Sequence, residues 1–403
     1  MTRPEAHRAP APWRFALALA LLGAGCAAHR PPTSVPLLIA DAAEQRSHQA
    51  MARADVLDRV VRRIEARGDR TLDILVLSGG GQGGAYGAGF LRGWKSRTGD
   101  PMPTFDVVTG ISTGALQAPF ALLGTDSSLA YASGLYRSAV DRIKPSLDPL
   151  FFVKGTGGVL KRTKLEATIA RIVDSTFAVQ LRREFDADRT LLVGTTDLDL
   201  GSGHIWDIAR ELDTSPAGLA RFRSLLIATS AIPGAFPPVV LDGHAHTDGG
   251  ITTNLLLGAD LEDFRGLAAR LHERNFKEPV RVRLWVVVNL WIHPAVQVTN
   301  ERSVRAIRGR GTALLYFSSQ QFALTRLWEL SSAVTTGVSG LTMEMHYTAA
   351  PDSFAALPAA NKLLDRRFME DLESAGYERA RGEHPWDALP INAFARPEPG
   401  ETR

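Results

Sequence analysis

The feature that most restricts the fold is a strand, a glycine turn and a helix in succession, found twice near the start of the chain. Leu72–Leu77 (LDILVL) is almost entirely apolar and leads into glycines, and Ala85–Trp94 then has helical character. Phe105–Thr109 runs in the same way into Gly110, and Thr113–Leu123 follows as an apolar, helix-like segment. Short apolar runs of this kind are typical of strands buried on both faces of a mostly parallel sheet. The pattern predicts an α/β fold with short connections from strand to helix.

Length and composition fit a soluble globular protein with one large domain or two modest ones. The chain has 403 residues, of which 45% are hydrophobic and 22% are charged, and these proportions are ordinary. The formal net charge is only +3 and no dense run of Lys and Arg occurs, so we expect no nucleic-acid partner. Further strands are predicted at Arg189–Asp197 and Val282–Ile292, and the pattern beyond Asn300 is mainly helical.

Residues 1–28 have the pattern of a secretory signal. Arg3, Arg8 and Arg14 precede a short apolar run, Phe15–Leu22, and small residues follow it. A basic start, an apolar stretch and small residues are the usual parts of such a signal. The apolar run is too short to span a bilayer as a helix, so we expect export.

Cys26, the only cysteine, lies where the apolar run ends, and its position resembles the lipidated cysteine of bacterial lipoproteins. The spacing departs from that pattern, because Leu22 lies four residues before Cys26 and the usual leucine lies one residue nearer. A plain signal peptide cleaved after Ala28 is the alternative. With Ala27 in place of an aspartate, the resemblance implies an outer-membrane anchor in a Gram-negative cell, facing the periplasm. Without lipidation the protein would be periplasmic or secreted.

Two glycine-rich segments carry the candidate chemistry. Seven glycines fall between Gly79 and Gly89, shortly after the first strand, and Gly110–Gly114 (GISTG) has the form G-x-S-x-G. A nucleophilic serine needs a tight turn from strand to helix, so that its hydroxyl projects above the sheet and the helix N-terminus faces the developing charge. The placement of Ser112 meets this requirement. The alternative is an ordinary turn in which Ser112 only caps the helix.

A serine nucleophile needs a base, and the sequence offers two kinds. A histidine oriented by a carboxylate is the usual partner, and His244 and His246 come closest to a suitable setting. The other histidines after the serine are His204, His272, His293, His346 and His384. Asp248 is followed by two glycines, so it can approach a neighbouring loop, and burial would raise its pKa and strengthen its hydrogen bond to a hydroxyl. A hairpin turn is the alternative for this segment.

Four segments in order resemble the patatin-like phospholipase family. They are SGGGQGGAYGAG from Ser78, GISTG from Gly110, SAIPGAFPPV from Ser230 and DGGITTN from Asp248. The resemblance covers roughly residues 72–256. It implies a three-layer α/β/α fold with a mostly parallel central sheet and a helical C-terminal part. It also implies a serine acyl hydrolase that cleaves lipid carboxylic esters, such as a phospholipase A or a lysophospholipase.

The resemblance assigns roles to individual residues. Ser112 matches the nucleophile and Asp248 the base of a catalytic dyad. The oxyanion-hole N–H groups are those of Gly79, Gly80, Gly81 and Thr113. The substrate would be a phospholipid or another lipid ester, and Cys26 would hold the protein at a membrane surface. No cofactor is implied, and no metal site is expected, because the histidines lack ligand spacing such as H-E-x-x-H.

The predicted organisation has four parts. Residues 1–28 form the signal, 29–70 a tether and an N-terminal helix, 71–300 the patatin-like catalytic domain, and 301–403 a helical part that packs on the same domain. One departure from the family lies at Gly83, where a basic residue, often arginine, is common. This change puts the oxyanion loop in question.

Three other functions fit some of the motifs. An α/β-hydrolase esterase with a Ser-Asp-His triad also combines a glycine-rich loop with G-x-S-x-G. A catalytically weakened, lipid-anchored binding protein would fit the change at Gly83. A nucleotide-binding protein is disfavoured, because the glycine run lacks the Gly-Lys-Ser/Thr ending of a phosphate-binding loop.

Overall fold

The computed structural model describes residue 30 and residues 33–151 and 155–388. The predicted signal and Cys26 lie outside these residues. Among the described residues, no helix combines the length and the apolar character that crossing a bilayer requires.

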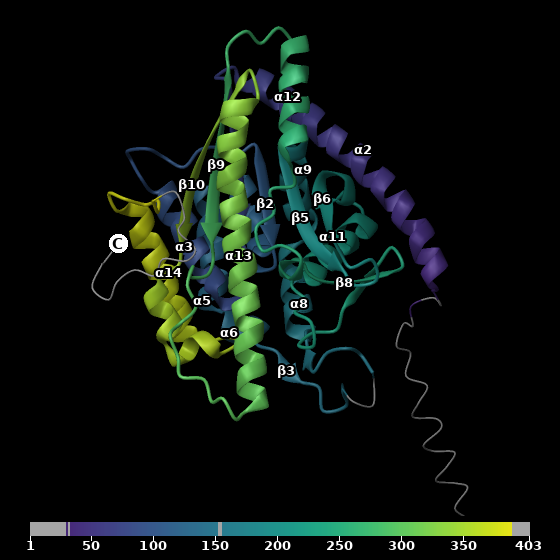
Figure 1. The fold of residues 1–403 in the computed structure, drawn as a ribbon, viewed down its shortest axis with the longest axis vertical. Coiled ribbons are helices and arrows are strands. Elements are labelled where there is room, and N and C mark those ends of the chain that lie inside the picture. The colour runs from purple at the N-terminus through teal and green to yellow at the C-terminus, as the bar shows by residue number, and fades with distance from the viewer. Residues whose placement is uncertain (1–29, 31–32, 152–154, 389–403) are drawn as a thin grey trace, which may run out of the picture.

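A central sheet of eight strands organises the molecule (Figure 1). Its strands are β1 (Thr71–Leu77), β2 (Val107–Ile111), β5 (Thr190–Asp197), β6 (Ser202–Asp207), β7 (Val239–Leu241), β8 (His244–Asp248), β9 (Val280–Val288) and β10 (Leu341–Ala349). The order is β10-β9-β1-β2-β5-β8-β7, with β6 also paired to β5. The first five strands of this order run parallel, and β6, β7 and β8 pair antiparallel. The predicted mostly parallel sheet is therefore confirmed.

Helices cover both faces of this sheet. They are α2 (Val35–Arg67), α3 (Gly84–Lys95), α4 (Thr113–Leu123), α5 (Asp126–Arg137), α6 (Ala139–Ile143), α8 (Thr163–Ile172), α9 (Ser175–Asp186), α10 (Ile208–Glu211), α11 (Pro216–Thr229), α12 (Leu261–Glu273), α13 (Val304–Gly337) and α14 (Arg366–Arg381). Short 3₁₀ turns occur at η1 (Gly81–Gly83), η2 (Gly249–Ile251), η3 (Asp352–Ala356) and η4 (Pro358–Asn361). A two-stranded ribbon pairs β3 (Ser146–Leu147) with β4 (Leu160–Lys161).

The alternation of side chains along β1 explains the three layers. Leu75 and Leu77 enter one hydrophobic core, which also holds buried residues of α3, α4 and α14. Ile74 and Val76 point to the opposite face, into a core shared with α2, α12 and α13. Successive residues of a strand face opposite sides of a sheet, so a strand that is apolar throughout needs helices on both sides.

The C-terminal part differs from the helical segment that the sequence suggested. It supplies α13 and α14, but β10 lies between them and forms the outer strand beside β9. α13 and β10 thus pack into the core that α2 and α12 cover, whereas α14 packs into the core on the opposite face of the sheet. At the N-terminal side, α2 begins at Val35 and has Pro36 in its first turn, where a missing N–H costs no hydrogen bond.

The parallel strands set the place of the candidate site. The carboxyl ends of β1, β2, β5 and β9 lie at the same edge of the sheet, because these strands run in the same direction. The glycine-rich loop leaves from β1 and Ser112 follows β2. The segment after β9 leads into the start of α13, which lies in the lower half of Figure 1.

Candidate active site

Ser112 occupies a strained turn between β2 and α4. Its φ of 53° and ψ of −124° are rare for a residue with a Cβ and persist only where the surroundings enforce them. The backbone N–H of Ser112 donates to the Oγ1 of Thr229 at 2.9 Å. That hydroxyl in turn donates to the carbonyl of Gly194 on β5 at 2.6 Å. This buried relay holds the serine at the carboxyl end of the sheet.

The register of the sheet brings Asp248 to Ser112. β2 pairs with β5 as far as Ile111, which lies opposite Gly194. The next residue of β5, Thr195, lies opposite Asp248 of β8, while β6 occupies the other edge of β5. Asp248 therefore lies where β2 would have continued, and the Ser112 side chain is near enough to its carboxyl to lower the pKa of that group. Each of the two residues keeps only 7% of its surface exposed.

The surroundings of Asp248 change its acidity. Burial raises the pKa of its carboxyl from 3.8 to about 6, against the opposing effect of hydrogen bonds from Ser112 and from the N–H of Gly250. The bond from Gly250 measures 2.8 Å. The Asp248 N–H donates to the carbonyl of Ala231 at 3.0 Å, so the proline-containing segment fixes the backbone of this aspartate. The residues after Asp248 form η2, and the chain does not turn back there as a hairpin.

The glycine-rich loop is held by an asparagine that sequence reasoning did not single out. Asn289, directly after β9, donates from Nδ2 to the carbonyl of Ser78 at 2.6 Å and from its backbone N–H to the Ser78 hydroxyl at 2.8 Å. The loop then passes Ser112 closely, because a Cβ on Gly79 would lie 3.2 Å from the Cβ of Ser112. The loop thus depends on β9, a strand far away in the sequence.

The predicted N–H donors gather around Ser112. Gly81 begins η1 and Thr113 begins α4, and the first N–H groups of a helix have no partner within the helix. Among the described residues, no hydrogen bond engages the N–H groups of Gly80, Gly81 or Thr113. Gly81, Ser112 and Thr113 line the same cavity. The Ser112 N–H differs from these groups, because Thr229 already binds it.

Gly83, where the family commonly has a basic residue, has no room for a side chain. A Cβ at this position would lie 2.2 Å from the backbone oxygen of Asn289 and 3.0 Å from the Cδ2 of Leu290. The segment after β9 therefore passes through the space that an arginine stem would need. The absence of a basic side chain at position 83 thus agrees with the close approach of this segment.

Gln82 connects the loop to the C-terminal segment. Its Nε2 donates to the carbonyls of Ala359 and Lys362, each at 2.8 Å, and its Oε1 accepts from the N–H of Asp365 at 2.8 Å. The neighbouring Leu363 and Leu364 line the cavity beside Ser112. A lone glutamine in a glycine run carries no sequence signal for this contact.

An apolar cavity lies beside Ser112. Side chains of α4, α5, α8 and α9 form much of its wall, including Leu116, Leu135, Ile169 and Phe177. Among the described residues that line it, Arg142 is charged and none is a histidine or a carboxylate. Ser112 thus lies in the wall of a largely apolar cavity.

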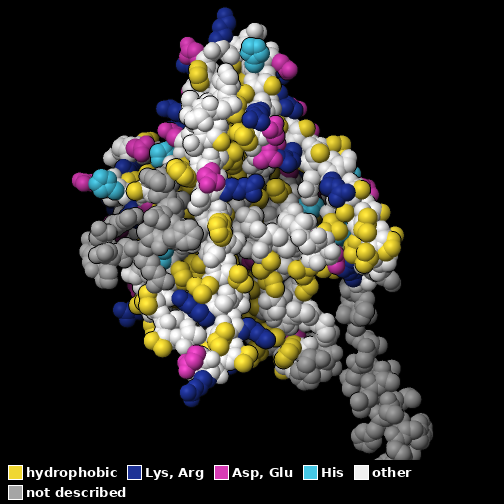
Figure 2. Space-filling view, viewed as in Figure 1, with side chains coloured by type: hydrophobic (Ala, Val, Ile, Leu, Met, Phe, Trp, Pro, Cys, Tyr) yellow, Lys and Arg dark blue, Asp and Glu magenta, His cyan; other side chains and the backbone are white. Residues whose placement is uncertain are grey.

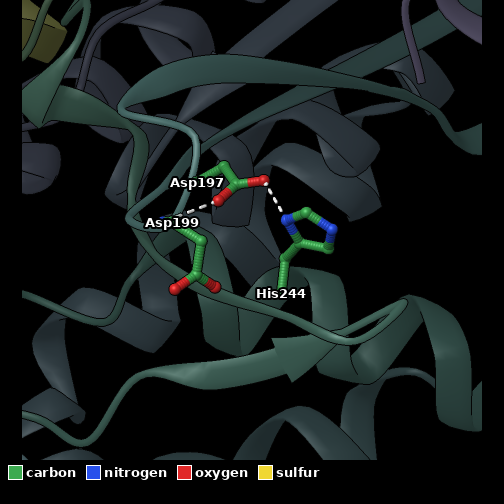
Figure 3. A group of neighbouring side chains, drawn as sticks. All are labelled: Asp197, Asp199 and His244. Atoms are coloured by element: carbon green, nitrogen blue, oxygen red, sulfur yellow. Dashed lines mark hydrogen bonds and ion pairs between the residues drawn. The ribbon is translucent and has the colours of Figure 1, made fainter. Parts of the chain in front are cut away.

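The histidines nearest in sequence to Asp248 interact elsewhere. Nδ1 of His244 lies 2.9 Å from the carboxylate of Asp197, and Nδ1 of His246 lies 3.0 Å from the hydroxyl of Thr195. Figure 3 shows His244 and Asp197 pointing toward each other, with Asp199 beside them.

Asp197, Asp199 and His244 bring ligand-type atoms within 4.8 Å of one another, although the sequence predicted no metal site. Protein groups already engage this cluster. Asp197 accepts the N–H of Asp199 at 2.8 Å, and Asp199 pairs with Arg30 at 2.7 Å. The ion pair with a guanidinium and the N–H donors give the carboxylates a role in fixing the turn between β5 and β6.

Comparison with known proteins agrees with the motifs. Residues 75–261 match the model of the family described as patatin-like phospholipase. Both Ser112 and Asp248 fall within this range. A search of the curated proteins found no match.

Among solved structures, the crystal structure of VipD from Legionella pneumophila is similar to this chain at 12% identity and a TM-score of 0.33. The match covers 77% of this chain and 66% of that chain.

Proposed function

We propose that the protein is a serine acyl hydrolase that cleaves carboxylic esters of lipids, as a phospholipase A or a lysophospholipase does. The observation that carries the proposal is the position of Ser112 next to the buried carboxyl of Asp248, beside an apolar cavity. The patatin-like phospholipase domain supports a lipid acyl hydrolase in general. In this proposal Ser112 is the nucleophile and Asp248 is the base.

The first half of the reaction acylates the serine. Asp248 takes the hydroxyl proton as the Ser112 Oγ attacks the ester carbonyl carbon, and the N–H groups of Gly80, Gly81 and Thr113 stabilise the resulting oxyanion. The carbon–oxygen bond of the ester then breaks. The leaving alcohol takes the proton from Asp248, and the acyl group stays on Ser112.

The second half releases the acyl group. Asp248, again ionised, takes a proton from water as that water attacks the acyl carbon. The bond to Ser112 breaks, the serine recovers its proton, and a fatty acid leaves. A carboxyl with a pKa of about 6 suits both steps near neutral pH, because it accepts and returns protons readily there.

The contacts of the histidines favour a dyad over a Ser-Asp-His triad. Within the described residues, His244 and His246 interact with Asp197 and Thr195, and no histidine lines the cavity at Ser112. The shielded position of Asp248 supplies the basicity that a histidine would otherwise provide.

The apolar wall of the cavity indicates the substrate class. An acyl chain gains about 0.8 kcal/mol for each CH₂ group that it buries, and the cavity presents apolar side chains on several helices. We therefore assign the acyl part of the ester to this cavity. Arg142, its charged lining residue, would favour an anionic group.

The place of action is part of the proposal. Cys26 would be lipidated after export and would hold the enzyme at a membrane that contains its substrate. Replacing Cys26 with serine should abolish labelling by radioactive palmitate and, in high salt, move the protein from the membrane fraction to the soluble fraction of cells. Unchanged fractionation and labelling would remove the anchor from the proposal.

A panel of phospholipids, lysophospholipids and glycerides tests the reaction. Wild type should hydrolyse at least one class and react with a fluorophosphonate probe, while Ser112→Ala should do neither and Asp248→Asn should lose hydrolysis. Ser374→Ala and Asp371→Asn on the exposed side of α14 are matched controls and should behave as wild type. Equal labelling of wild type and Ser112→Ala would exclude Ser112 as the nucleophile.

A further inference from the structure

The two halves of α13 have different surroundings. The buried residues of this helix are Gln320, Leu324, Leu327, Ser331 and Val334. All of them lie at residue 320 or beyond, and none of the sixteen residues before it is buried. The first sixteen residues of α13 thus lie on the surface at the carboxyl edge of the sheet.

Large apolar side chains are exposed along this surface. Their exposed fractions are 72% for Val304, 50% for Ile307, 40% for Leu314, 74% for Leu315 and 69% for Phe322. At 100° per residue these five side chains lie on one side of the helix, opposite the side that buries Gln320 and Leu324. We call these five residues the α13 stripe. A contiguous exposed apolar face of this kind marks an interaction site.

Arginines accompany the α13 stripe. Arg305 and Arg308 are exposed and Arg310 is half-buried, and the sequence from residue 302 to residue 328 contains no Asp or Glu. Among the described residues, none of these three arginines forms an ion pair, and Arg310 donates to the carbonyl of Ala295. Figure 2 shows apolar and basic side chains together over the lower half of this face.

The combination selects one kind of partner. A helix with an apolar stripe and arginines beside it is typical of helices that lie in a membrane interface and bind anionic lipids. A second copy of the same face would bring arginines against arginines, and like charges oppose such contact. The preceding segment adds Val296 and Val298, which are 81% and 101% exposed.

The inner side of the same helix reaches the candidate active site. The Oε1 of Gln320 accepts from the Nδ2 of Asn254 at 2.8 Å, and Asn254 lies against Gly79. The negative charge of Asp248 contributes, after burial, to raising the pKa of Tyr316 above its ordinary value. A bilayer on the outer side of α13 would therefore lie one helix diameter, about 10 Å, from the catalytic groups.

We propose that the N-terminal part of α13, residues 304–322, docks the protein onto an anionic lipid bilayer, with the α13 stripe in the interface and Arg305 and Arg308 on the headgroups. The docking implies that the enzyme meets its lipid substrate in a bilayer, and in this respect it rests on the proposed function. It is separate from any anchor at Cys26.

Vesicle sedimentation tests the docking without hydrolysis. The full chain carrying Cys26→Ser and Ser112→Ala is mixed with vesicles of phosphatidylcholine, with or without 30% phosphatidylglycerol. We expect binding that needs phosphatidylglycerol and weakens with salt. Arg305→Glu with Arg308→Glu should lower the partition coefficient at least about tenfold, and Leu315→Ser with Phe322→Ser should do the same. The matched controls are Arg183→Glu and Val179→Ser, both exposed on α9.

The outcomes separate the docking from the proposed function. In the Cys26→Ser background with Ser112 intact, the α13 variants should hydrolyse a water-soluble ester as the parent does but lose activity on anionic vesicles. The docking is overturned if both double variants bind anionic vesicles as strongly as the parent protein does. It is also overturned by a dimer that Leu315→Ser with Phe322→Ser disrupts, since the stripe would then bind a second copy. If no ester is hydrolysed while vesicle binding follows this pattern, the proposed function fails and the docking stands.

Discussion

Ser112 and Asp248 are neighbours because β8 takes the place of β2 along one edge of β5. Ile111, the last residue of β2, lies opposite Gly194, and Asp248 lies opposite the next residue, Thr195. Ser112 follows the last residue of β2, and Asp248 is the last residue of β8, which runs in the opposite direction. The two side chains therefore meet where the two strands end. No flexible loop is needed to bring the two groups together, so their closeness is set by the sheet itself.

The first prediction concerns the cost of keeping Asp248 ionised in the protein. Raising its pKa from 3.8 to about 6 makes the ionised form about 3 kcal/mol less favourable in the folded state. The folded protein binds this proton more tightly, so Asp248 lowers the free energy of unfolding as pH rises from about 4 to above 6. Asp248→Asn removes this dependence.

Denaturant unfolding at pH 4 and pH 7.5 measures the effect. The stability of Asp248→Asn relative to wild type should increase by about 2.5 kcal/mol between the two pH values, although activity is lost. Asp371→Asn is the control, because Asp371 is exposed and is expected to show no such increase. A constant difference between Asp248→Asn and wild type would contradict the assigned burial cost.

The second prediction concerns the pH dependence of catalysis. Asp248 must be ionised to accept the serine proton, and its pKa is about 6. Below that pH, kcat/KM should fall about tenfold per pH unit, and above pH 7 it should level off. The profile is measured on a soluble ester whose own ionisation lies outside this range. If kcat/KM instead begins to fall only near pH 4, Asp248 is solvated during the reaction.

The third prediction uses the strained backbone of Ser112. Glycine adopts φ 53° and ψ −124° without the Cβ penalty. Both Ser112→Gly and Ser112→Ala remove the hydroxyl, so the free energies of unfolding of the two variants differ mainly through the backbone. We expect Ser112→Gly to be more stable by about 1 kcal/mol. At Ser374, inside α14, the glycine variant should instead be less stable than the alanine variant by about 1 kcal/mol, and the same order at both sites would mean that Ser112 is unstrained.

Several elements of the fold depend on short stretches of sequence and could therefore be predicted from it. The run LDILVL predicts a doubly covered strand, and β1 is buried at every position. The GISTG turn follows β2 and opens α4 as expected. Such features depend on a few consecutive residues, because turn geometry and side-chain alternation are short-range properties.

Other features depend on contacts that no local pattern encodes. β10 follows a long helix, and alternate residues in its first half are exposed. Its pairing with β9 depends on the free edge of the sheet and not on a pattern within its own sequence. Asn289 and Gln82 are single polar residues whose partners lie far along the chain. The roles of Ser112 and Asp248 came from a family resemblance, and their closeness follows from the register of three strands. Register of this kind is a property of the assembled sheet.

The fourth prediction concerns Thr229, which binds the Ser112 N–H and the Gly194 carbonyl through one hydroxyl. Thr229→Val keeps the shape but leaves both buried groups unpaired, which should cost about 1–3 kcal/mol. It should also lower kcat with little change in KM for a soluble ester, since the serine loses its support. Thr190→Val is the control on β5: the Thr190 hydroxyl is buried with no partner among the described residues, so this change should be neutral or stabilising. Equal losses in both variants would mean that burial alone matters.

The last prediction returns to Gly83. A Cβ there would lie 2.2 Å from the Asn289 oxygen, a backbone atom that cannot rotate away. Gly83→Arg should therefore fail to strengthen catalysis, and Gly83→Ala should lose about 1–3 kcal/mol of stability, as overpacked sites do. Gly134→Ala, inside α5 with open space around the new Cβ, should instead gain about 0.5–1 kcal/mol. Thermal melts and ester hydrolysis measure both effects. A stable Gly83→Arg variant with raised kcat would mean that the segment after β9 can move aside and that the loop accepts the family's charge.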